Sequence, residues 1–124
     1  MKHNLIYKKE VYQLGGLLFD VYKELRFGFQ EKYYTRAFEQ LLIKNEIKYD
    51  KEVCFPIYFK NKLIGRYFFD FLIDDKIIME FKVAEDYKKS HIQQILAYLN
   101  VKRLKLGLLI IITRDGIKFR RVVN

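Results

Sequence analysis

The sequence predicts an α/β fold in which helices flank a mixed β-sheet. Apolar residues recur at helical spacing in three segments. Five runs rich in β-branched and aromatic residues predict strands. The predicted order is two helices, three strands, one helix and two strands, and its strand–helix–strand step favours one parallel pair. A length of 124 residues suits a single domain, residues 1–124.

The three predicted helices cover residues 8–26, 30–45 and 87–102. Gly15-Gly16 lies inside the first helix, where each glycine costs about 1 kcal/mol relative to alanine, and this indicates close packing against another backbone. Gly28 is expected to form a turn or cap between the first two helices.

The predicted strands surround the third helix. Pro56 cannot donate a ladder hydrogen bond, so the first strand should lie at an edge of the sheet. The fourth strand is expected to run parallel to the third, because a helix connects them. The strands are predicted over residues 53–59, 63–73, 76–83, 106–113 and 117–123.

Two neighbouring runs, residues 66–73 and 76–82, are strongly apolar yet carry charge at their centres. An unpaired buried carboxylate is costly, so such groups are usually paired or bound to a cation. A three-residue turn between the runs would place Asp70 directly opposite Glu80, with Cβ atoms about 4.5–5.5 Å apart. Strand alternation puts Lys82 on the same face as Glu80.

The same register predicts a wholly apolar layer on the opposite face of the hairpin. A two-residue turn would shift the register by one and place the two carboxylates on opposite faces. A partly exposed hairpin with ordinary solvated charges is a further alternative. The apolar layer favours the three-residue turn and consists of Phe69, Phe71, Ile73, Ile77, Met79 and Phe81.

A motif of glycine, glutamate and tyrosine at Gly28, Glu31 and Tyr34 resembles the signature of the GxxExxY family of small bacterial proteins, a branch of the PD-(D/E)xK nuclease-like superfamily. Further matching positions follow in order at Tyr58, Ile64, Gly65, Tyr67, Asp70, Glu80, Lys82, His91, Gln94, Tyr98 and Leu99. The chain departs from the family pattern at residues 25–28, where the family has an LGPG turn, at Tyr22, often a histidine, and at Phe68, often an arginine.

The resemblance implies a restriction-endonuclease-like αβββαβ core and metal-dependent cleavage of nucleic acid. Asp70 and Glu80 are the expected ligands of Mg²⁺ or Mn²⁺, because both cations prefer carboxylate, carbonyl and water oxygens. The resemblance adds the backbone carbonyl of Phe81 as a ligand. Lys82 would position or activate the attacking water and offset charge in the transition state.

Three further polar residues are weighed as parts of the site. Glu31 is a candidate metal ligand, often through water, or a carboxylate that stabilises a helix N-terminus by about 0.3–1 kcal/mol. Gln94 matches a position that supports the active site in the superfamily, and its alternative is a solvated helix face. His91 is expected to be exposed, and His3 to lie in a disordered terminus.

The composition limits the classes of binding partner that the protein is expected to have. The net charge of +9, from 24 basic and 15 acidic residues, suits a polyanion, and DNA is expected in preference to RNA. The single cysteine, Cys54, lies in an apolar run and is expected to be a buried small hydrophobe. A homodimer is left open.

The same survey excludes several function classes. The sequence shows no signal peptide and no membrane span, so the cytoplasm is the expected compartment. Zinc-type clusters, a P-loop and a dinucleotide glycine fingerprint are also missing. The predicted function is a metal-dependent nuclease, and the alternative is a non-catalytic nucleic-acid-binding or accessory interaction module with the same fold.

Overall fold

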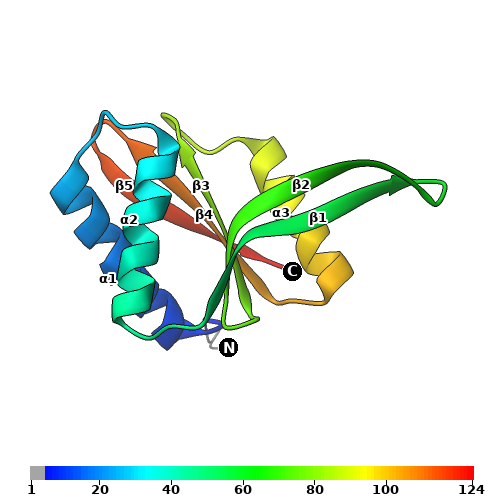
Figure 1. Ribbon diagram of the computed structural model, residues 1–124, viewed down its shortest axis with the longest axis horizontal. Coiled ribbons are helices and arrows are strands. Elements are labelled where there is room, and N and C mark those ends of the chain that lie inside the picture. Colours follow the sequence, from blue (N-terminus) through cyan, green and yellow to red (C-terminus); the bar gives the residue numbers. More distant parts are fainter. Residues whose placement is uncertain (1–4) are drawn as a thin grey trace.

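The computed structural model describes residues 5–124, so His3 lies outside the described residues. Within that range three helices and five strands follow one another in the predicted order (Figure 1). None of these helices is long and apolar enough to cross a membrane. The elements are α1 (Lys8–Leu25), α2 (Glu31–Lys44), β1 (Tyr49–Phe59), β2 (Lys62–Ile73), β3 (Ile77–Val83), α3 (Lys89–Lys102), β4 (Leu106–Thr113) and β5 (Gly116–Val123).

The strands form one mixed sheet in the order β1-β2-β3-β4-β5. Only β3 and β4 are parallel, and α3 makes the crossover between them. The predicted parallel pair is therefore confirmed, and so is the position of the Pro56 strand at an edge. A mixed sheet flanked by helices is the predicted restriction-endonuclease-like architecture.

The helices cover the sheet from both sides (Figure 1). On one face, Leu18 of α1 and Phe38 of α2 pack with Phe81 of β3 in the larger core cluster. On the other face, Ile95 of α3 packs in a second cluster. Gly107 permits this approach, because a Cβ there would lie 2.4 Å from Cγ2 of Ile95. Since both faces of β3 are covered, this strand is buried along most of its length and is a rigid support for side chains.

The turn between β2 and β3 has the predicted three-residue form. Ile73 pairs with Ile77, and the N–H of Lys76 donates to the carbonyl of Ile73 at 2.8 Å. Asp74 and Asp75 adopt left-handed backbone angles, with φ of 50° and 56°. These angles allow the short connection, and the predicted register is confirmed.

The pairing of β2 with β3 is short, and this opens the sheet. It ends at the pair Phe71–Met79. Beyond that point β2 continues with β1 alone, as a long two-stranded hairpin that extends past α3 (Figure 1). The β2-facing side of residues 80–83 in β3 thus lacks a strand partner in the sheet, and we call it the open edge.

The separation of the strands also explains a wrong prediction. Phe69 was expected in the apolar layer with Phe71, but it packs in the cluster of α3 on the other face. The pairs Lys51–Phe71 and Val53–Phe69 flank Glu52, whose φ is 52°. Regular alternation of side chains is therefore broken at this point of the hairpin.

Two smaller predictions are also wrong. Cys54 is exposed, because it pairs with the exposed Phe68 on the uncovered face of the hairpin. Gly15 and Gly16 do not meet another backbone. A Cβ at Gly15 would lie 3.2 Å from the ring of Phe119, and one at Gly16 would meet open space.

Candidate active site

The open edge of β3 is capped by two carboxylates. The N–H of Phe81 donates to Oδ2 of Asp70 at 2.7 Å, and the N–H of Val83 donates to Oε1 of Glu31 at 3.1 Å. These side chains replace the hydrogen bonds that a neighbouring strand would supply. The N–H and C=O of one residue lie on the same side of a strand, so the carbonyl of Phe81 faces the same edge.

Glu80 is the one charged residue of the described range that is buried, with 4% of its surface exposed. The hydroxyl of Tyr67 donates a hydrogen bond to its Oε2, and Nζ of Lys82 lies 3.8 Å from the same oxygen. Its carboxyl group also shares a hydrogen bond with that of Asp70. The predicted convergence of Asp70, Glu80 and Lys82 is therefore present.

Burial disfavours negative charge at this pair. Burial, and then the adjacent Asp70 carboxyl group, raise the pKa of Glu80 to about 8. Burial also raises the pKa of Asp70, although the hydrogen bonds from Glu80 and Phe81 and the charge of Lys82 oppose that effect. Without a cation, the two groups therefore hold a proton between them near neutral pH, and a bound cation would displace it.

Each residue of the glycine–glutamate–tyrosine motif helps to place Glu31. Gly28 has a φ of +130°, which side-chain-bearing residues rarely adopt, and it lies in the loop before α2. The buried Tyr34 hydroxyl donates to the carbonyl of Arg26 at 2.5 Å and accepts from the N–H of Phe29 at 3.3 Å. The loop is thereby fixed, and α2 begins at Glu31 with its carboxylate directed at β3. Burial raises the pKa of Glu31, and the Val83 N–H and Lys82 oppose the rise.

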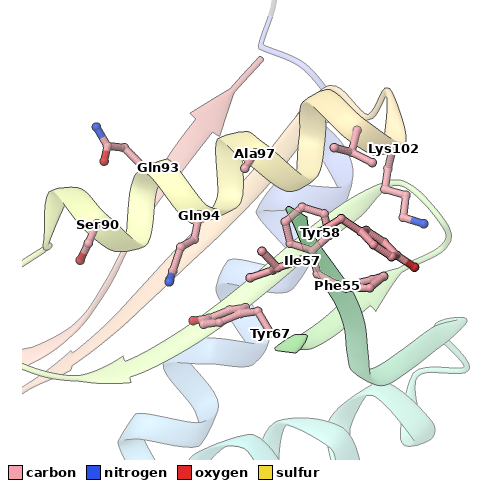
Figure 2. A pocket seen from close by; sticks show the side chains of 11 residues that line it. Phe55, Ile57, Tyr58, Tyr67, Ser90, Gln93, Gln94, Ala97 and Lys102 are labelled. Carbon is pink, nitrogen blue, oxygen red and sulfur yellow. The ribbon is translucent and has the colours of Figure 1, made fainter. Parts of the chain in front are cut away.

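The residues of α3 lie beside this cluster. Gln94 is half-buried and lines a cavity together with Tyr67, toward which it points in Figure 2. His91 is not exposed as predicted. Its Nδ1 is buried without a hydrogen-bond partner, and burial, Lys82 and Lys88 lower its pKa.

Sequence reasoning missed the part played by Tyr67. Strand alternation would direct an odd-numbered residue of β2 away from Asp70, but the irregularity near Phe69 turns Tyr67 toward Glu80. Burial, and then the hydrogen bond to Glu80, raise the pKa of Tyr67, so its hydroxyl remains a donor. The only sequence signal was its place in the family pattern.

The donor set suits a hard divalent cation. Within residues 5–124 no three Asp, Glu, His or Cys side chains are grouped as a metal cage. Mg²⁺ usually keeps several waters and takes only one or two carboxylates from the protein. Asp70, Glu80 and the Phe81 carbonyl meet that requirement. Glu31 lies near them, because the charge of Asp70 contributes to the raised pKa of Glu31.

Comparison with known proteins identifies the superfamily of the chain. Residues 8–122 match the family model described as the PD-(D/E)XK nuclease superfamily. The chain belongs to this superfamily. PD-(D/E)XK nucleases generally use divalent metals.

One solved structure has a similar fold. The crystal structure of SSO0001 is similar to 95% of the chain, with a TM-score of 0.56 and 22% sequence identity. The chain spans 57% of the length of that structure. No curated protein matches the sequence.

Proposed function

We propose that this PD-(D/E)XK protein is a phosphodiesterase that cleaves nucleic acid with Mg²⁺ or Mn²⁺. DNA is favoured over RNA as the substrate. The observation that carries the proposal is the buried Asp70–Glu80 pair, with Lys82 3.8 Å from Glu80, at an edge where β3 has no strand neighbour. A fold needs no such costly pair for stability. Membership of the GxxExxY family and a cytoplasmic location are parts of the same proposal.

The ligands would be Asp70, Glu80 and the Phe81 carbonyl, with Glu31 directly or through water. A bound divalent cation supplies Lewis-acid polarisation of a phosphate oxygen and lowers the pKa of a bound water. The hydrogen bond from Phe81 N–H orients Asp70, and the hydroxyl of Tyr67 orients Glu80. These fixed contacts reduce the reorganisation needed when the phosphate arrives.

Lys82 supplies the positive charge of the proposed mechanism. Its side chain is 28% exposed, so Nζ reaches both Glu80 and the solvent side of the cluster. An ammonium group there would offset charge on the phosphorane-like transition state and orient the attacking water. Gln94 would act through Tyr67, whose ring it faces across the cavity.

Basic residues beside Asp70 suit a phosphate backbone. A second cavity of about 350 Å³ is lined by three basic residues, Lys32, Arg36 and Lys51, and by four acidic residues, Glu31, Glu39, Glu52 and Asp70. Lys51 pairs with Glu39 at 3.3 Å, so Lys32 and Arg36 are the basic residues left to contact a phosphate. Lysine and arginine at phosphate contacts release condensed counterions, which is the main source of sequence-independent affinity. The net charge of +9 acts in the same direction.

A non-catalytic module is the second candidate. One observation favours it: Tyr67 and Lys82 already partner Glu80, as they would in a structural polar cluster. A module of this kind would bind nucleic acid through its basic residues, with or without metal.

Metal-dependent cleavage of plasmid and single-stranded DNA separates the two candidates. Asp70→Asn should abolish cleavage, because the amide keeps an acceptor for Phe81 N–H but loses the charge that binds the cation. Asp74→Asn is the matched control on the same hairpin, since asparagine tolerates the left-handed φ of 50° there. Equal cleavage by both variants, or none by the wild type with either metal, would favour the binding module.

A further inference from the structure

A groove leads away from the candidate active site between the β1–β2 hairpin and α3. It has a volume of about 680 Å³, within the range of about 300–1,000 Å³ typical of ligand sites. Figure 2 shows Phe55, Ile57 and Tyr58 of the hairpin on one side and Gln94 and Ala97 of α3 on the other. We call this space the hairpin–α3 groove.

The groove is continuous with the Asp70–Glu80 cluster through Tyr67. The ring of Tyr67 lines the groove, while its hydroxyl donates to Oε2 of Glu80. A group held against this ring therefore lies next to the carboxylates that would hold the cation. The groove and the cluster are neighbouring parts of one surface rather than two separate sites.

The lining combines aromatic faces with few polar groups. Tyr58 is 60% exposed although it is a large aromatic residue at the mouth of the groove. The pairing of β1 with β2 shifts register between Ile57 and Tyr58, so consecutive residues both line the groove. Irregularities of this kind re-aim side chains and are frequent next to active sites.

The polar groups of the groove suit a neutral ring attached to an anionic chain. No lining residue, all of them within the described range, carries a carboxylate. Gln94 offers an amide, which both donates and accepts hydrogen bonds. Lys102 lies at one end, Lys60 lies in the turn at the tip of the hairpin, and Lys62 begins β2 directly after that turn. Positive charge around an aromatic groove is typical of sites that track a single strand.

We propose that the hairpin–α3 groove binds an unstacked base of single-stranded nucleic acid, with the adjoining phosphate beside the cation that Asp70 and Glu80 would bind. The inference rests on the proposed nuclease function and names its substrate class as single strands or unpaired ends. Bases of an intact duplex are stacked and paired, so their faces are not available to Tyr58 and Tyr67. An extended base presents both its face to the tyrosines and its edge to Gln94.

Binding in EDTA tests the groove without cleavage. The probes are a fluorescein-labelled 12-nucleotide strand and the duplex of the same sequence, measured by anisotropy. Tyr58→Ala should weaken single-strand binding about tenfold, the effect of losing one stacking face, and leave duplex binding within about twofold. Tyr58→Phe keeps the aromatic face and should bind like the wild type.

Tyr12→Ala is the matched control, because Tyr12 is 86% exposed on α1, on the other side of the sheet. It should leave both affinities unchanged. The melting temperature of each variant confirms folding. Unchanged single-strand binding in Tyr58→Ala, or an equal loss for strand and duplex, would overturn the groove proposal, and the groove would then be open to a protein partner.

Cleavage of the same two probes with Mn²⁺ separates this inference from the proposed function. If wild type cleaves the single strand faster than the duplex, and Tyr58→Ala reduces that preference, the result supports both the nuclease proposal and the groove proposal. Equal cleavage of both probes by wild type and Tyr58→Ala would leave the nuclease proposal intact and overturn the groove. Selective binding without any cleavage would support the groove and refute the nuclease.

Discussion

Replacing Glu80 by glutamine should change how the stability of the metal-free protein depends on pH. The ordinary pKa of a glutamate is 4.5, and burial beside Asp70 raises that of Glu80 to about 8 in the folded protein. Between these values the native state binds more protons than the unfolded chain. The free energy of unfolding therefore falls as pH rises through this interval.

The size of the effect follows from the same two values. A tenfold change in proton affinity corresponds to about 1.4 kcal/mol, so the complete loss above pH 8 is at most about 5 kcal/mol. Asp70 and Glu31 also have raised pKa values and act in the same direction. His91 acts in the opposite direction, because a lowered pKa makes the native state bind fewer protons. The difference between wild type and Glu80→Gln measures the contribution of the Glu80–Asp70 pair, because each group affects the pKa of the other.

Urea unfolding in EDTA at pH 5 and pH 8.5 measures this difference. From pH 5 to pH 8.5, the free energy of unfolding of wild type should fall by several kcal/mol more than that of Glu80→Gln. Glu85→Gln, at an exposed position, is the control and should behave like wild type. Millimolar Mg²⁺ or Mn²⁺ at pH 8.5 should restore stability to wild type but not to Glu80→Gln, since a ligand stabilises only the state that binds it. Identical pH profiles for the two proteins would refute the raised pKa of Glu80.

Three other outcomes are expected. Lys82→Ala should retain metal and nucleic-acid binding but cleave slower than wild type by a factor on the order of 10² or more in single-turnover assays, and Lys82→Arg should restore the rate only in part. Equal cleavage rates for wild type and Lys82→Ala would indicate a contaminating nuclease. Affinity for duplex DNA should fall with salt at a log–log slope of about −0.9 per neutralised phosphate, and Arg36→Ala should reduce the slope by about 1, whereas a salt-independent affinity would exclude this interface. Gly28→Ala should lower the free energy of unfolding by about 1–3 kcal/mol because of the φ of +130°, and an unchanged urea midpoint would show that the loop does not depend on that angle.

Local patterns were sufficient for the sheet core and for the carboxylate pair. The apolar alternation of residues 71–79 has only one register that buries it, so the turn and the approach of Asp70 to Glu80 were predictable. The early start of β1, at Tyr49 rather than residue 53, was not predictable, because Asp50, Lys51 and Glu52 are charged and exposed. Their strand conformation is imposed by pairing with β2.

The rest of the site depends on contacts that no local pattern contains. The separation of β2 from β3 reverses the direction of Tyr67 and Phe69, and it depends on the backbone at Glu52 and on the packing of the hairpin over α3. The burial of His91 likewise results from the position of α3 against the sheet. Sequence alternation assumes a continuous strand, so it fails where the sheet opens and the site forms.

The opening of the sheet also explains how one set of carboxylates can serve folding and metal binding together. Asp70 uses Oδ2 to cap Phe81, and Glu31 uses Oε1 to cap Val83. Oε2 of Glu80 accepts the hydrogen bond from Tyr67 and pairs with Nζ of Lys82. Each contact involves one oxygen of a group that has two, and a carboxylate accepts at both. The capping bonds can therefore persist while the second oxygens of Asp70 and Glu80 bind a cation, so metal binding need not unfold the edge that positions its ligands.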